Sequence, residues 1–276
     1  MDVSSLKIKL RQHLSYHFGS WTGGLVLINF ILFVLISYSS HSLFVPDSRS
    51  LISWGAKDPI SILQGQWWRF FTPIFLHFGI IHFLLNNLAL RVIGLYLEKL
   101  IGSGWFITIY IVSGISGNIL STFFNVSIGA GASGSIFGLI GVGMVMEQVF
   151  QIKHSGTMRL RVGPFTSMAL LNFAIAFIFN FLSFVFDGSI GIDNAAHTGG
   201  LLAGIILGVV MFLIRKNPFF IPRYFWGYSI LSSFILALVV GAYIPIKTNF
   251  LYEKVLREVY KKKNKRAESR TSLIIV

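Results

Sequence analysis

The sequence contains no cysteine and few charged residues. The absence of cysteine excludes disulfide bridges, thiolate metal sites and a cysteine nucleophile. Charged residues make up 12% of the 276 positions, whereas a soluble globular domain has about 25%. Hydrophobic residues make up 54%, and the mean hydropathy is +0.72. This composition excludes an ordinary soluble domain and a disordered chain, and it favours a protein that crosses a membrane several times.

Acidic residues are scarcer than basic ones, which leaves the chain strongly basic. There are 10 Asp and Glu against 23 Lys and Arg, so the formal net charge is +13. In so apolar a chain, basic residues orient the membrane helices and contact anionic lipid headgroups. We therefore expect membrane lipid as a partner, and we do not expect nucleic acid.

Long apolar stretches predict the fold class. A helix needs about 20 apolar residues to cross a bilayer core of about 30 Å. Seven stretches satisfy this requirement: 21–38, 79–97, 105–124, 133–150, 165–186, 192–214 and 225–244. We expect an all-α multi-pass membrane protein, with six spans in one bundle and one extra transmembrane helix at the C-terminal end.

Lysine and arginine in the connections predict the orientation and the organisation of the chain. Eleven of them lie on the side of the N-terminus and three on the other side, so the N-terminus is expected to be cytoplasmic. We divide the chain into a cytoplasmic segment, a six-span domain, a basic connection, a seventh span and a basic tail: 1–20, 21–214, 215–224, 225–244 and 245–276. Because the tail is so basic, an alternative is a re-entrant or interfacial segment at 225–244 with a cytoplasmic tail.

The 39–78 connection is long for a compact membrane domain. It contains a cluster of aromatic residues around one cation, with Trp67 and Trp68 followed by Arg69. Tryptophan and arginine of this kind lie at the level of the lipid headgroups, which gives one interpretation, an aromatic belt. The other interpretation is a folded loop that lies partly in the outer leaflet.

Polar residues inside a span are costly in lipid and mark candidate functional positions. In the second span, His82 and Asn86 are four residues apart and share a helix face, while His77 stands at the entrance of the helix. We interpret His77 as support for the long loop. His82 and Asn86 could serve a site, or they could only join neighbouring helices by hydrogen bonds.

Small residues predict that the fourth and sixth spans pack closely. Ser133 lies in the string Gly131-Ala132-Ser133-Gly134, at the junction where a loop enters the fourth span. In the sixth span, His197 shares a face with Gly200 and Gly204, and the fourth span carries a matching pair, Gly134 and Gly138. Glycines four residues apart allow two helices to touch. The faces that bear Ser133 and His197 can therefore meet at a similar depth.

Taken together, these motifs resemble the rhomboid intramembrane serine proteases across about residues 22–214. The resemblance implies a six-helix bundle around a water-filled cavity, in which Ser133 is the nucleophile and His197 the general base. It further implies that Asn86, His82 and the backbone N–H of Ser133 form the oxyanion site. The remaining matched positions would support the structure: His77, Trp68, Arg69, Gly131, Gly134, Gly138, Gly200 and Gly204.

The resemblance also implies the substrate and the location. The substrates would be transmembrane segments of other proteins, cut near their outer end, and no metal or organic cofactor is implied. We expect a multi-pass protein of a bacterial cell (inner) membrane, with the active site opening toward the outer face. The alternative is a non-proteolytic membrane-protein binder, or a multi-pass transporter with a polar path through His82, Asn86 and His197.

Three further side chains have expected roles near this site. Phe137, four residues after Ser133, is expected to pack against the imidazole of His197. Asp193 lies four residues before His197 and could orient it, but we favour a solvated position at the loop end. Glu147 lies near the cytoplasmic end of the fourth span, and its side chain is expected to reach the membrane surface from there.

Overall fold

Long helices account for most of the chain in the computed structural model, which describes residues 19–155, 162–186, 191–216 and 257. Six helices are long and apolar enough to cross a membrane: α2 (Trp21–Ser39), α5 (Ile80–Ile101), α6 (Ser103–Phe124), α7 (Ser133–Ser155), α8 (Pro164–Val185) and α9 (Asn194–Lys216). They confirm the first six predicted spans. The predicted seventh span at 225–244 and the tail at 245–276 lie outside the described residues, as does most of the 1–20 segment.

Two carboxylates, one buried and one partly buried, fix the starts of two of these helices. Glu98 near the end of α5 accepts hydrogen bonds from the backbone N–H groups of Trp21 and Thr22, at 2.9 and 3.0 Å. It thereby satisfies donors that the first turn of α2 leaves unpaired. Glu147 of α7 does the same for α8, accepting from the N–H of Phe165 at 2.6 Å. Glu147 was expected to reach the membrane surface, and the structure adds a role as a helix cap that this expectation did not include.

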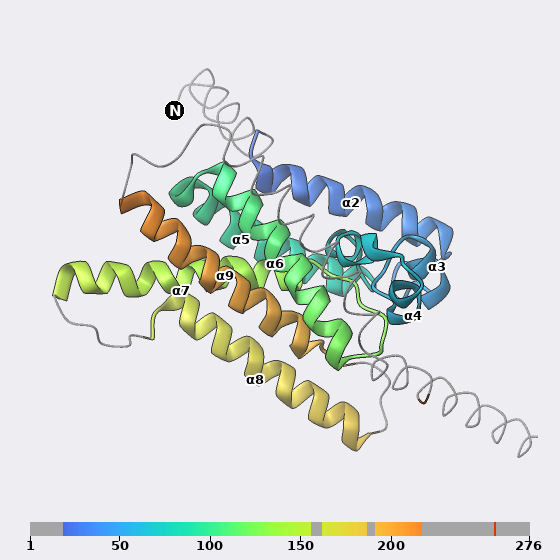
Figure 1. Cartoon of the computed structure of the whole chain (residues 1–276). Helices are drawn as coiled ribbons and strands as arrows, with labels where there is room; N and C mark the ends of the chain where they lie inside the picture. The colour runs from blue at the N-terminus through green and yellow to red at the C-terminus, as the bar shows by residue number, and fades with distance from the viewer. Residues whose placement is uncertain (1–18, 156–161, 187–190, 217–256, 258–276) are drawn as a thin grey trace, which may run out of the picture.

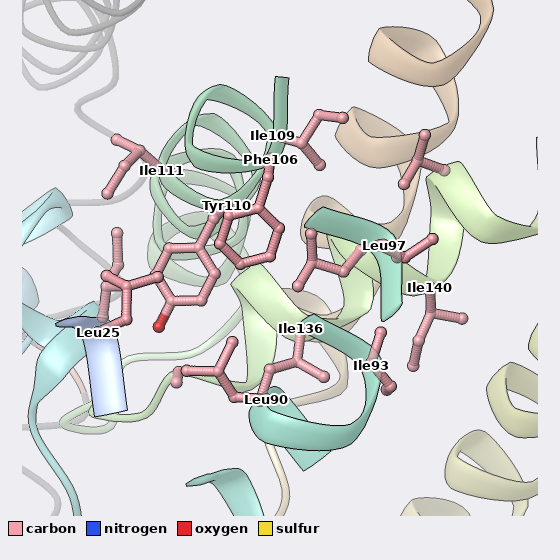
Figure 2. Close-up of a cluster of buried hydrophobic side chains, with 14 of the residues drawn as sticks. Leu25, Leu90, Ile93, Leu97, Phe106, Ile109, Tyr110, Ile111, Ile136 and Ile140 are labelled. Carbon is pink, nitrogen blue, oxygen red and sulfur yellow. The ribbon is translucent and has the colours of Figure 1, made fainter. Parts of the chain in front are cut away.

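A cluster of apolar side chains joins α5, α6 and α7 (Figure 2). It includes Leu90 and Leu97 from α5, Phe106 and Tyr110 from α6, and Ile136 from α7, with Leu25 added from α2. All of these side chains are buried. Because lipid is as apolar as these side chains, their packing depends on close van der Waals contact, and this contact fixes the mutual positions of the helices.

The backbones of α7 and α9 touch through glycines. A Cβ placed on Gly200 would lie 2.0 Å from the carbonyl oxygen of Gly134, and one on Gly204 would lie 2.0 Å from that of Gly138. An adjoining face of α9 meets α6 in the same way, since a Cβ on Gly117 would lie 2.5 Å from the carbonyl oxygen of Ala196. Helix α9 is therefore held between α6 and α7, and the name glycine seam is used below for these contacts (Figure 1).

The long connection between α2 and α5 is folded. It contains α3 (Ser48–Ser53), α4 (Pro59–Leu63) and the two 3₁₀ turns η1 (Trp67–Phe70) and η2 (Thr72–Phe75), which lie beside the end of α2 in Figure 1. Arg69 is buried, and its guanidinium donates to the carbonyls of Ile52 and Ala56 at 2.7 and 2.9 Å. Trp68 is half exposed. Arg69 therefore does not belong to an aromatic belt at the lipid headgroups. Its hydrogen bonds join two parts of the folded loop.

Helix α8 lies at the edge of the bundle. Its buried residues are Ala169 and Ala176, and it packs mainly on α7. Much of the rest of its surface is apolar and exposed, including Phe177, Phe181 and Phe184. A surface of this kind suits contact with lipid.

Candidate active site

Ser133 is the first residue of α7, and the loop before it approaches with an unusual backbone. Gly131 has φ +143°, a conformation that side-chain-bearing residues rarely adopt, and its N–H donates to the carbonyl of Pro73 at 2.9 Å. The N–H groups in the first turn of a helix have no acceptor within the helix. The hydroxyl of Ser133 is thus presented beside backbone donors, at the positive end of the α7 dipole.

The structure places Ser133 against His197. The Oγ of Ser133 lies 2.9 Å from the Nε2 of His197, across the glycine seam between α7 and α9. The ring of Phe137 stacks on the imidazole, with centroids 4.3 Å apart and planes 15° apart. A neutral imidazole that accepts the Ser133 proton at Nε2 carries its own proton on Nδ1. Among the described residues, that Nδ1 has no hydrogen-bond partner.

Asp193 does not contact the ring nitrogens of His197. Its Oδ1 accepts from the N–H of Ala196 at 3.0 Å, which caps the start of α9, and its Oδ2 accepts from the hydroxyl of Ser121. The expectation of a solvated loop end holds in part, because the side chain of Asp193 is 23% exposed but is also hydrogen-bonded within the protein. The described side chains therefore do not form a Ser-His-Asp triad.

His82 lies close to Ser133, beside Gly131. A Cβ on Gly131 would be 3.0 Å from the Nε2 of His82 and 3.7 Å from the Oγ of Ser133, so the missing side chain leaves room between the two groups. The Nδ1 of His82 accepts from the N–H of Phe78 at 3.3 Å. This hydrogen bond assigns the imidazole proton to Nε2, the nitrogen that faces Gly131.

Asn86 and His77 both contact His82. The amide of Asn86 donates to the carbonyl of His82 at 2.9 Å, so one of its two N–H bonds is used within α5. His77 is fully buried and packs edge-on against the rings of His82 and Phe83, with centroids 5.4 and 5.5 Å away. Together with Phe78, it fixes the orientation of the His82 ring.

Several contacts around the site were not predicted from the sequence. The long loop reaches the site through Lys57, which is fully buried, and α6 contributes Ser121. Gly117 and Gly199 complete the glycine seam on the α6 side. The glycines could have been recognised from their spacing along α6 and α9. The contacts of Lys57 and Ser121 carry no sequence signal, because neither residue belongs to a periodic pattern.

The fold and this site define a multi-pass helical membrane protein that holds a Ser–His pair at one end of its bundle. A family model described as "Rhomboid domain" matches residues 64–214. The chain belongs to the rhomboid family.

Three relatives illustrate the range of the family. "Rhomboid protease GluP" of Bacillus subtilis (strain 168) is 35% identical over 221 residues, which cover 78% of this chain and 38% of that protein. "RHOMBOID-like protein 1" of Arabidopsis thaliana is 36% identical over 183 residues, or 64% of this chain and 43% of that protein. "Rhomboid-like protease 3" of Toxoplasma gondii is 32% identical over 230 residues, or 79% and 81%. The chain thus spans about two fifths of the length of the first two.

Proposed function

We propose that the protein is an intramembrane serine endopeptidase that hydrolyses peptide bonds in or near transmembrane segments of other membrane proteins. The observation that carries the proposal is the 2.9 Å contact between the Oγ of Ser133 and the Nε2 of His197. A serine hydroxyl is a weak nucleophile until an adjacent base accepts its proton, and this geometry supplies the base. Relatives that are themselves named rhomboid proteases support the same function.

The reaction follows from the positions of the two side chains. His197 takes the hydroxyl proton at Nε2 while Oγ attacks the carbonyl carbon of the substrate, and it then gives this proton to the leaving amine. Water, activated by the same nitrogen, hydrolyses the resulting ester of Ser133. Because Nδ1 has no partner among the described residues, the stack on Phe137 is what maintains the plane of the ring.

The developing oxyanion is assigned to the space beside Gly131. This space lies beside the Oγ of Ser133 and the protonated Nε2 of His82, and Asn86 stands one helical turn further along the same face of α5. We propose the N–H of Ser133 as a further donor. Hydrogen-bond donors that are already in place stabilise the negative charge of the transition state, and in many enzymes this is the largest single contribution to the rate enhancement. A side chain at Gly131 would occupy this space.

The location of the pair within the bundle supports the proposed substrate class. A transmembrane helix hides its peptide bonds in internal hydrogen bonds, so a substrate has to unwind locally before Ser133 can reach a carbonyl carbon. We propose that the site opens toward the outer face of a bacterial inner membrane, in accordance with the distribution of basic residues in the connections.

The experiment that tests this function is cleavage of a labelled model transmembrane substrate by the full chain in liposomes. Ser133→Ala and His197→Ala are each expected to abolish cleavage, and the double variant should be no worse than either, because the two residues act as a unit. Labelling by a fluorophosphonate should be lost with Ser133→Ala. A non-proteolytic binder or transporter would show neither cleavage nor labelling in the wild type.

Ser135→Ala is the matched control. Ser135 lies two residues further along α7, its hydroxyl is buried, and it faces Gly114 of α6 rather than His197. Cleavage and labelling should both persist in this variant at close to wild-type rates. Equal loss in Ser133→Ala and Ser135→Ala would mean that packing of α7, and not a nucleophile, had been removed.

A further inference from the structure

Lys57 is a buried cation that the proposed reaction does not use. Its side chain is 0% exposed, although it comes from the long loop between α2 and α5. Its Nζ donates to the hydroxyl of Ser121 at 2.6 Å and to the carbonyl of Asn125 at 3.0 Å, and it lies 3.7 Å from the Oδ2 of Asp193. A charge withdrawn from water is costly unless it is paired and hydrogen-bonded, and these contacts provide both.

The main chain of Lys57 is joined to the segment that precedes the nucleophile. Its N–H donates to the carbonyl of Gly129 at 2.8 Å, and the N–H of Gly129 donates back at 2.9 Å, which forms an isolated antiparallel bridge. Gly129 also packs on the Lys57 side chain, where an added Cβ would lie 3.1 Å from Cε. Gly131, which flanks the proposed oxyanion position, comes two residues later, and Ser133 comes four residues later.

The side chain of Lys57 is joined to the start of the helix that carries the base. Ser121 lies between Lys57 and Asp193 and contacts both, donating its own proton to the carboxylate. Asp193 in turn accepts from the N–H of Ala196 with its side chain, and from the N–H of His197 with its carbonyl, at 3.0 and 3.2 Å. One residue therefore holds the approach to Ser133 with its backbone and the cap of the His197 helix with its side chain.

We propose that Lys57 is a positioning residue of the active site, which sets the distance between the nucleophile and the base by joining the 125–132 segment to the cap of α9. This inference rests on the proposed proteolytic function. Ser121 and Lys57 also resemble a serine with a lysine base. They are unsuited to that role because both are fully buried and the Ser121 proton is directed to Asp193.

The test measures chemistry separately from substrate binding. In the full chain in liposomes, Lys57→Met keeps the backbone bridge and removes the cation. We expect kcat, and the rate at which fluorophosphonate labels Ser133, to fall about ten- to a hundredfold, because small displacements of reacting groups have effects of this size. KM should change little. Wild-type labelling and kcat in Lys57→Met, or an effect on KM alone, would overturn the proposal.

Asp193→Asn provides a second, nearly isosteric test of the same link. It should lower labelling and kcat about tenfold or more, and the double variant should recover part of the loss seen in Lys57→Met. The recovery is expected because the double variant no longer leaves the carboxylate of Asp193 without its cation, and residues in one network are not additive. If Lys57→Met does not fold, Asp193→Asn and Ser121→Ala decide the outcome, and wild-type rates in both would overturn the proposal.

Arg49→Met is the matched control, since it removes an exposed cation from the same loop. It should leave labelling, kcat and melting temperature unchanged. Failure of the proposed function would give a different result from failure of this inference. In the first case the wild type would neither cleave nor label, while melting temperatures of the Lys57 and Asp193 variants would still report their coupling. In the second case the wild type would do both, and Lys57→Met would do so equally well.

Discussion

Asn86 and Asn87 are adjacent asparagines in α5 with different surroundings, and they allow one role to be tested against another. Under the proposed function, Asn86 faces the site, while its neighbour donates to the carbonyl of Phe83 and accepts from Asn29 of α2. We predict that Asn86→Ala lowers kcat about ten- to a thousandfold at nearly constant KM, because an oxyanion donor acts mainly in the transition state. Steady-state kinetics in liposomes measure both constants.

Asn87→Ala is the control for this prediction. It leaves the amide of Asn29 without its partner between α2 and α5, which should cost about 1–3 kcal/mol of stability. The kcat of the folded enzyme should stay at the wild-type value. A higher KM with an unchanged kcat in Asn86→Ala would contradict the role assigned to it.

The charge of Lys57 predicts a pH dependence of stability. Burial lowers the pKa of Lys57 from 10.5 to about 8, although Asp193 and Asp58 act in the opposite direction. Between pH 8 and 10.5 the unfolded chain therefore binds more protons than the folded one, so the contribution of Lys57 to stability rises with pH. We predict that the wild type gains stability relative to Lys57→Met across this window, by roughly 3 kcal/mol at most.

Melting temperatures of the two proteins in the same detergent, measured at pH 7 and at pH 10, test this prediction. The comparison with Lys57→Met removes the contributions of other groups that titrate in alkali. A difference between the two proteins that stays constant from pH 7 to pH 10 would mean that folding does not lower the pKa of Lys57, which then stays protonated in both states.

Residues of the candidate site differ in how far the sequence alone identifies them. Ser133 and His197 could be paired because each stands beside glycines at helical spacing, and small residues indicate where two helices approach. The roles of Lys57 and Asp193 could not be inferred, because the two residues are distant in sequence and come together, directly and through Ser121, only in the folded chain. Charge alone suggested a solvated loop end for Asp193, since burial depends on which elements pack over it.

At the scale of the elements, the glycine seam is the feature that sets the position of α9. Alanine at Gly204 would place a methyl group 2.0 Å from the carbonyl oxygen of Gly138. We predict that Gly204→Ala destabilises the protein by about 1–3 kcal/mol, because an overpacked contact forces the backbones apart. It should also lower kcat up to about a hundredfold, since the displaced helix carries His197.

Gly24→Ala is the matched control for the seam. Gly24 also lies inside a long helix, but an added Cβ there meets nothing within 4 Å. Alanine favours helix over glycine by about 1 kcal/mol, so this variant should be as stable as the wild type or more so. If both variants melt and cleave like the wild type, contact between α7 and α9 does not determine the geometry of the site.

The helices themselves were predictable, but their ends were less so. The second predicted span stops at residue 97, whereas α5 continues to Ile101. The predicted span ends before Glu98 because a carboxylate is unfavourable in lipid. In the fold, however, this carboxylate accepts hydrogen bonds from the start of α2. The folded loop was open to two interpretations, because the burial of Arg69 depends on carbonyls of Ile52 and Ala56 that no sequence pattern connects to it.

At the scale of the whole molecule, the absence of cysteine provides a direct test of orientation, since any introduced cysteine is unique. Ser127 in the 125–132 segment and Lys99 near the end of α5 are both exposed. From the excess of basic residues on the N-terminal side, we predict that Ser127→Cys reacts with an impermeant maleimide in intact cells. Lys99→Cys should react only after the membrane is permeabilised, and the reverse result would invert the orientation.

The position of α9 between α6 and α7 also determines when the site can exist during synthesis. Ser133 leaves the ribosome 64 residues before His197, and α8, which is made between them, packs at the edge. At about 5–20 residues per second, the base follows the nucleophile by roughly 3–13 s. Under the proposed function, a nascent chain carries its serine without a base through this interval. On that proposal, the chain is inert toward other newly inserted membrane proteins until α9 has been inserted.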